Sequence, residues 1–240
     1  MRTYEDLLEM ADADDVGAMV TAVQEFVWNM DPQTQEELGV KDKIINYVMK
    51  AIDAGSCNAM NQLGAMYAEG RLVKKDPGMS FYWYKIASEH GNVEAIGNLG
   101  FNYLYGNGTE QNYELAFRTF AKGAALGQGD SLVRLGDMYL NGWFVEKDPL
   151  SAFRMYIQAA IIAKDDLDNW GNQQVYSDAL FRIGSCHYYG IGAEKCLSDA
   201  LGDLSTALHF YELREARGDA YSAEGYADTK EMLKRVVAEL

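Results

Sequence analysis

The sequence repeats the skeleton L-G-x-x-Y-x-x-G at a constant interval of 36 residues, beginning at Leu63, Leu99 and Leu135. A second set of columns keeps the same register and places a phenylalanine 18 residues after each of these leucines. A fixed period of this length is typical of solenoid proteins, in which each unit buries its apolar face only against its neighbours. The repeat therefore predicts a stack of similar units instead of a globule built around one core.

The spacing within one unit predicts two helices. Ala59, Leu63 and Tyr67 lie on one helical face, and the glycine three residues after the tyrosine suits a left-handed helix end. The second helix is expected to begin at Asp76-Pro77, because aspartate caps helix N-termini and proline is tolerated at the first helical position. The glycine after each motif leucine should let a neighbouring helix approach closely. We expect the motif tyrosines Tyr67, Tyr103 and Tyr139 to be core residues.

A fourth unit is altered, and its motif begins at Ile183-Gly184, 48 residues after the third. His187 replaces the motif tyrosine, and 12 additional residues lie between Ala163 and Ala179. We predict an acidic helical cap with a degenerate repeat over 1–58, repeats over 59–94, 95–130, 131–178 and 179–218, and a capping helix over 219–240.

The combined pattern, A-x-x-x-L-G-x-x-Y-x-x-G followed by a capping aspartate, A-x-x-W-Y-x-x-A-A and a closing glycine, resembles the Sel-one-like repeat, a relative of the tetratricopeptide repeat. The resemblance implies an all-α fold, a right-handed α/α superhelix of helix-turn-helix repeats. It also implies an adaptor or scaffold role with diverse partners. Some secreted members of the family carry cysteine pairs seven residues apart and are described as β-lactamase-like. Cys186 and Cys196 are ten residues apart, so this chain lacks that pairing.

The composition restricts the class of partner. The formal net charge is −15, and a chain this acidic is a poor ligand for nucleic acid or an anionic membrane surface. No apolar run is long enough for a membrane span, and the acidic N-terminal sequence has no secretory h-region. The three cysteines are an odd number, which favours reduced thiols and a cytoplasmic location.

The sequence contains no recognisable catalytic motif: no nucleophile elbow, P-loop or H-E-x-x-H. The best metal candidates are Cys186, His187, Cys196 and His209, but no C-x-x-C pair accompanies them. We therefore expect no metal or other cofactor and no enzymatic activity. A β-lactamase-like or metal-dependent hydrolase remains the alternative from another functional class.

A partner-binding surface can be predicted from the related tetratricopeptide stack, in which the first helix of each unit lines the concave face. The exposed columns are then −5, −2, +2, +5 and +6 relative to the motif Leu or Ile, which share one helical face. Aromatic side chains beside carboxylates suit a peptide or protein segment that carries Lys or Arg. The predicted binding residues are Glu94, Phe101, Tyr105, Asp130, Asp137, Asp178, Phe181 and Tyr189.

Four alternatives accompany this prediction. In the first, the aromatic residues are buried and the acids only cap the first helices; in the second, the contact surface is a second patch formed by Trp143, Phe144 and Trp170. In the third, the chain is an immunity-type inhibitor of a basic toxin, which its charge permits; in the fourth, it self-associates as a structural piece. Neither the partner nor the oligomeric state follows from the sequence.

Overall fold

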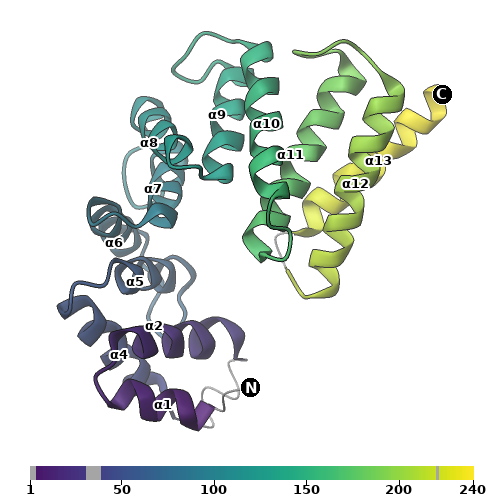
Figure 1. The fold of residues 1–240 in the computed structure, drawn as a ribbon. Coiled ribbons are helices and arrows are strands. Elements are labelled where there is room, and N and C mark those ends of the chain that lie inside the picture. Colours follow the sequence, from purple (N-terminus) through teal and green to yellow (C-terminus); the bar gives the residue numbers. More distant parts are fainter. Residues whose placement is uncertain (1–3, 31–38, 220–221) are drawn as a thin grey trace. The chain divides into compact units, whose positions relative to one another are not determined.

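The computed structural model describes residues 4–30, 39–219 and 222–240, with the side chains of Tyr4, Glu5, Leu7 and Trp170 excepted. Within these ranges the chain forms helices joined by short loops, and none of the described residues forms a strand (Figure 1). The prediction of an all-α repeat fold is therefore confirmed. The chain divides into two compact units, residues 1–116 and 117–240, and each is described by itself.

The first unit begins with helices that share one apolar core with the first repeat. Phe26, Ile44 and Val48 are fully buried there, against Leu63 and Met66 of the first repeat. The helices are α1 (Tyr4–Asp12), α2 (Val16–Gln24), the π-helical turn η1 (Glu25–Asn29), α4 (Lys41–Asp53), α5 (Cys57–Glu69), α6 (Pro77–Glu89) and α7 (Val93–Tyr105). Helix α8 (Tyr113–Ala125) contains the boundary between the two units.

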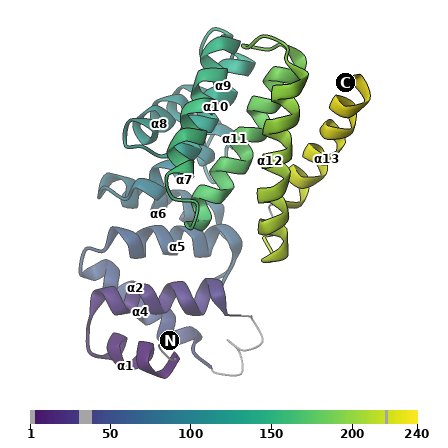
Figure 2. The same ribbon diagram turned by 45° about the vertical axis from the view of Figure 1, so that its right-hand side comes forward.

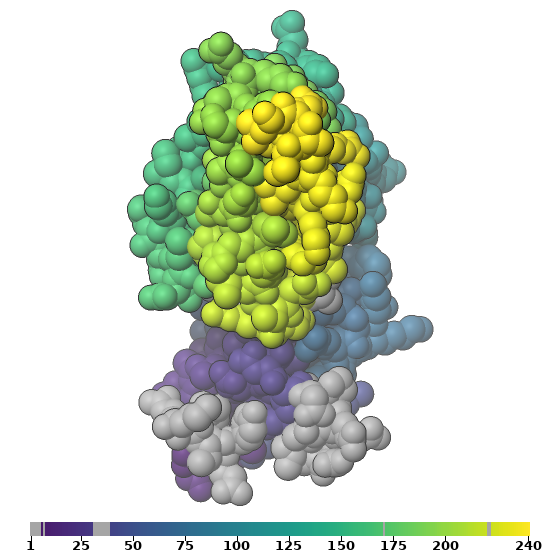
Figure 3. All heavy atoms as spheres, turned by 90° about the vertical axis from the view of Figure 1, so that its right-hand side faces the viewer, coloured from purple at the N-terminus to yellow at the C-terminus, as the bar shows by residue number. Residues whose placement is uncertain are grey.

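The second unit continues the alternation of paired helices (Figure 2). Its further helices are α9 (Gly129–Asn141), α10 (Pro149–Lys164), α11 (Trp170–Tyr189), α12 (Leu197–Ala216) and α13 (Ser222–Glu239). The 12 inserted residues mainly lengthen α10 and α11, leaving only a short turn over 165–169. Figure 3 shows α13, in yellow, lying over α12. We call α5, α7, α9 and α11 the A helices, and α6, α8, α10 and α12 the B helices.

The predicted helix ends are confirmed. The side chains of Asp76 and Asp148 accept hydrogen bonds from backbone N–H groups three residues later, both at 3.0 Å, and each is followed by proline. Asn112 caps α8 in the same way. Each A helix ends on a glycine with a positive φ between 69° and 78°, a conformation that glycine adopts without strain. The fourth unit departs from this pattern at Cys196, whose side chain makes no capping bond.

In the first, third and fourth repeats the glycine after the motif Leu or Ile accommodates a side chain of its own hairpin. A Cβ atom at Gly64 would lie 2.7 Å from the ring of Tyr84, and one at Gly136 would lie 2.4 Å from the ring of Tyr156. Both tyrosines are buried on B helices. In the fourth unit Leu204 takes the place of the ring, 2.7 Å from a Cβ at Gly184. The close approach predicted from these glycines therefore holds two helices of one repeat together.

The motif tyrosines are half-buried and pack against the apolar core clusters, so the prediction that they are core residues holds only in part. The rings of Tyr103 and Tyr139 pack edge-on against a phenylalanine from the B helix of the preceding repeat. The pairs are Phe81 with Tyr103 at 5.5 Å between centroids, Phe117 with Tyr139 at 5.7 Å and, with histidine in place of tyrosine, Phe153 with His187 at 5.3 Å. T-shaped aromatic pairs of this kind stabilise by about 0.5–1.5 kcal/mol beyond their burial. This column therefore joins consecutive repeats.

The glycine–ring contact generates a stability prediction. We expect Gly136→Ala to lower the free energy of unfolding by about 2–3 kcal/mol, because the new methyl group would overlap the buried ring of Tyr156. Gly202→Ala is the matched control in the same unit, because Gly202 lies within α12 with no neighbouring atom within 4 Å of the position that its new methyl group would take. The control should gain about 0.5–1 kcal/mol from helix propensity. Urea denaturation measures both, and equal effects of the two variants would contradict the contact.

Candidate partner-binding surface

The first unit contains a pocket of about 460 Å³ at the A-helix face of its first repeats. Asn58, Asn61 and Ala65 line it from α5 in the −5, −2 and +2 columns, and Glu94 lines it from the −5 column of α7. The remaining wall residues come from α2, η1 and α5: Val20, Thr21, Gln24, Trp28 and Gln62. The pocket therefore contains most of the predicted columns of the first repeat, together with N-terminal residues that sequence reasoning missed.

Side-chain amides organise this pocket. Asn61 donates from Nδ2 to Oε2 of Glu94 at 3.2 Å and accepts a hydrogen bond from Asn98 at 3.2 Å. Gln62 donates from Nε2 to Oε1 of Gln24 at 3.1 Å and to the backbone carbonyl of Val20 at 3.4 Å. These bonds fix the orientation of the Gln62 side-chain amide. The carbonyl of Val20 can only accept a hydrogen bond, so the Gln62 atom that faces it is the nitrogen.

Phe101 and Tyr105 form the aromatic part of the predicted site in the first unit. Their rings stack with centroids 6.1 Å apart and an angle of 14° between the planes. Phe101 is half-buried, whereas Tyr105 is 55% exposed. The alternative that the predicted aromatics are simply core residues therefore does not describe Tyr105.

The second unit contains a more apolar pocket of about 350 Å³ between α9, α10 and α11. Predicted columns again supply most of the wall, including Asp137, Phe181 and Tyr189 from the predicted binding residues. Tyr189 is 51% exposed and packs edge-on to Tyr188 at 4.7 Å. The other lining residues are Leu140, Tyr156, Arg182, Ser185, Cys186 and Ile191.

Asp137 forms the charged floor of this pocket. Arg182 donates to both carboxylate oxygens, from Nε to Oδ1 at 2.7 Å and from Nη2 to Oδ2 at 3.0 Å. Arg134 and the hydroxyl of Tyr156 contact the same carboxylate at 3.1 and 2.9 Å. Burial acts to raise the pKa of Asp137, but Arg182, Arg134 and the Tyr156 hydroxyl together outweigh it, so the pKa lies below its ordinary value. This carboxylate is therefore neutralised by the chain itself.

Asp178 is also engaged within the second unit. Its Oδ1 accepts a hydrogen bond from the hydroxyl of Tyr211 at 2.8 Å and lies 3.3 Å from Nη1 of Arg214. Arg214 is 1% exposed and also donates to Asp219 at 2.8 Å and to the hydroxyl of Ser177 at 2.8 Å. Breaking such a buried pair is costly, so Asp178 supports the packing of α11 on α12.

The structure also decides whether the predicted acids cap the A helices. Glu94 and Asp130 lie in the first turn of α7 and α9, where a negative charge is favourable, but Asn92 and Gln128 occupy the N-cap positions. Asp178 lies inside α11, because the insertion starts that helix at residue 170. The capping interpretation is therefore wrong for all three acids.

Burial raises the pKa of Asp130, whose nearby charges are Arg134, Asp178, Arg182 and Arg214.

The second predicted patch is described only in part. Phe144 is 51% exposed and has a φ of +70°, an unusual conformation for a residue other than glycine. Its ring lies 5.7 Å from that of Phe117, and Trp143 beside it is half-buried. The side chain of Trp170 lies outside the described residues, so its relation to this patch is not assigned.

The arginines are the main feature of the site that sequence reasoning missed. Arg134 and Arg182 both occupy the column immediately before the motif Leu or Ile. An acid in the +2 column, such as Asp137, faces that column on the next A helix. This fixed offset is the signal that could have predicted the ion pair.

Possible catalytic groups are few in the described part of the chain. No three His, Cys, Asp or Glu residues there are grouped closely enough to hold a metal ion. His187 lies 2.9 Å from Asp203 through Nδ1, with its ring packed on Phe153. Burial raises the pKa of the Cys186 thiol to about 11, which keeps it protonated at neutral pH.

No helix of the described ranges has both the length and the apolar character that a membrane crossing requires.

Substitution of two acids on α9, Asp130 and Asp137, should change the free energy of unfolding in opposite directions. We expect Asp137→Asn to lower the free energy of unfolding at pH 7 by on the order of 3 kcal/mol, because Arg182 loses its buried partner. Asp130→Asn should instead stabilise the protein at pH 7, because burial disfavours the ionised Asp130 carboxylate.

The pH dependence of unfolding by urea provides the check on these signs. Asp137 has a lowered pKa, so its contribution is present above the ordinary value of 3.8 and is lost as pH falls through its native pKa. Asp130 has a raised pKa, so the advantage of Asp130→Asn should be absent below 3.8, grow as pH rises from 3.8 to the native pKa, and be complete above it. Parallel pH profiles for the two variants would contradict the assigned environments.

The repeat region matches a known protein family. The family model described as Sel1 repeat matches residues 57–92, 93–128, 129–161 and 177–213, more than half of the chain. No match is found among curated protein sequences. The chain resembles the crystal structure of a Sel1 repeat protein from Oxalobacter formigenes, with 21% identity and a TM-score of 0.66 over 92% of this chain and 57% of that one.

A second similar structure is a protective antigen present in uropathogenic Escherichia coli strains that displays an SLR fold. It shares 19% identity and a TM-score of 0.58 over 97% of this chain and 57% of its own. The chain thus spans little more than half of either protein, and at these identities the likeness concerns the fold. On the four matched repeats and their observed helix pairs, the chain belongs to the Sel1 repeat family.

Proposed function

We propose that this chain is a non-catalytic adaptor that binds a segment of another protein on the faces of its A helices. Sel1 repeat proteins generally mediate protein–protein interaction. The observation that supports this surface is that a pocket in each unit is lined by residues of the −5, −2, +2, +5 and +6 columns, four of the nine described lining residues in the first unit and five of nine in the second. In this proposal residues 1–58 and 219–240 close the ends of the repeat array.

The chemistry of these pockets favours a segment with both basic and apolar side chains. Tyr189 and Phe181 offer an apolar wall in the second unit, whereas Glu94 offers a carboxylate in the first. Asp137 and Asp178 already pair with arginines, so we assign them a structural role within the site. The net charge of −15 would steer a basic partner toward the chain over a longer range.

The two alternative functions receive less support. A hydrolase would need an activated nucleophile, but Cys186 is buried with a raised pKa and His187 is packed between Asp203 and Phe153. An immunity-type inhibitor would use the same acidic surface and is therefore a special case of the adaptor proposal. The three cysteines are free thiols, which fits the cytoplasmic location that we propose.

Matched tyrosine substitutions test the proposed surface. A protein captured by the full chain from native extract should bind Tyr189→Ala about tenfold more weakly, a loss of about 1.4 kcal/mol, because an aromatic contact is removed. Tyr82→Ala is the control, because Tyr82 on α6 is also 51% exposed and lies outside both pockets. Titration of the purified partner measures both affinities. Equal binding by wild type and Tyr189→Ala, or a loss caused by Tyr82→Ala, would contradict the proposed surface.

A further inference from the structure

The −5 column carries acids that are neutralised differently in the two units. In the second unit Asp178 pairs with the guanidinium group of Arg214 at 3.3 Å. The nearby Asp137 in the +2 column receives a bidentate guanidinium contact from Arg182. Glu94 occupies the −5 column in the first unit, where the neutral amide of Asn61 contacts it and no described Lys or Arg forms an ion pair with it. Asp137 and Asp178 therefore have arginine partners within the chain, whereas Glu94 has, among the residues that the structure describes, only the amide of Asn61.

The pocket around Glu94 favours a donor-rich, positively charged ligand. No lysine or arginine is among the described residues that line it, and Glu94 is exposed. Oxygen atoms of Thr21, Gln24 and Gln62 supply further acceptors on the same walls. Trp28 and Val20 add apolar surface, against which the methylene stem of a long basic side chain can pack.

Gln62 provides an independent observation. Its side chain is part of the pocket wall and only 9% exposed, and its Oε1 makes no hydrogen bond with any described residue. The bonds from its Nε2 to Val20 and Gln24 fix which atom is the oxygen. A buried acceptor left without a donor costs about 1–3 kcal/mol, so a ligand N–H that reaches this oxygen would recover that cost.

We propose that this pocket binds the guanidinium group of an arginine side chain carried by the bound protein segment. The inference rests on the adaptor function and specifies one of its contacts. Arginine fits better than lysine because its planar group presents five N–H donors and can serve Glu94 and the amide oxygens together. Trp28 already makes one such contact within the chain, since the guanidinium of Arg71 lies 5.0 Å from its ring centroid while it also donates to the carbonyl of Val27.

Capped tripeptides test this contact on the full chain. The probes are N-acetylated, C-amidated Gly-Arg-Gly, Gly-Lys-Gly and Gly-citrulline-Gly, of which citrulline is a neutral isostere of arginine. We expect the arginine probe to shift the side-chain amide NMR signals of Asn61 and Gln62 saturably, with a Kd of about 1 mM. The lysine probe should bind at least about fivefold more weakly, and the citrulline probe should cause no saturable shift.

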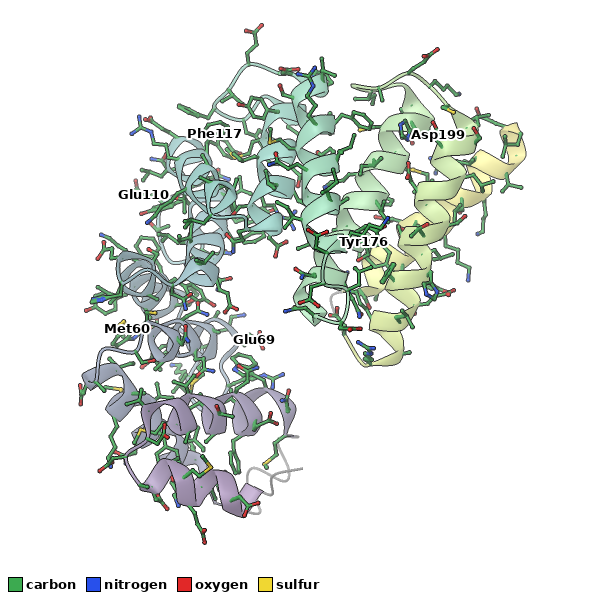
Figure 4. The ribbon with its side chains drawn as sticks, in the orientation of Figure 1. Met60, Glu69, Glu110, Phe117, Tyr176 and Asp199 are labelled. Atoms are coloured by element: carbon green, nitrogen blue, oxygen red, sulfur yellow. The ribbon has the colours of Figure 1, made fainter. Side chains whose placement is uncertain are left out.

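Charge-matched variants complete the test. Glu94→Gln should weaken arginine binding by about tenfold and Glu94→Asp should retain most of it, because the ionised carboxylate is the principal partner. Glu110→Gln is the control, because Glu110 is an exposed carboxylate between α7 and α8 outside the pocket (Figure 4). Equal shifts with the arginine and citrulline probes, or unchanged binding by Glu94→Gln, would overturn the inference. A captured partner that still depends on Tyr189 would then leave the adaptor function standing.

Discussion

The contact between the motif glycine of an A helix and the ring of its B helix is the interaction on which this structure depends. Gly64 and Gly136 let Tyr84 and Tyr156 reach the A-helix backbone, which holds these two hairpins together. Because one hairpin cannot bury its apolar face alone, a second contact must join it to the next. The edge-on pairs of Phe81 with Tyr103 and Phe153 with His187 supply this contact, one residue from each of two consecutive repeats.

These packing contacts use other columns of the A helices than the two pockets do. The leucine and tyrosine columns are occupied by packing between helices, whereas the −5, −2 and +2 columns carry side chains of different chemistry from repeat to repeat. In the second unit these columns carry Asp137 and Asp178, which the chain has used for buried ion pairs. In the first unit they carry Asn61 and Glu94, which form a polar pocket without a cationic lining residue among those described. One scaffold therefore presents two chemically different surfaces.

The sequence predicted those features that depend on local geometry or on the period. The caps at Asp76 and Asp148 and the left-handed glycine ends follow from neighbouring residues, so they could be predicted without a structure. The pairing of Asp137 with Arg182 depends on two residues 45 positions apart. The exposure of the motif tyrosines depends on how much of each ring the preceding phenylalanine covers. Such three-dimensional contacts are not encoded in one repeat, which is why both were missed.

The central claim is that the A-helix faces form the binding surface of this Sel1 repeat protein. Hydrogen–deuterium exchange of the full chain with and without its captured partner tests this claim most directly. The account predicts slowed exchange concentrated in α5, α7, α9 and α11. Protection confined to the B helices α6 and α10, or to the loop at Phe144, would contradict it.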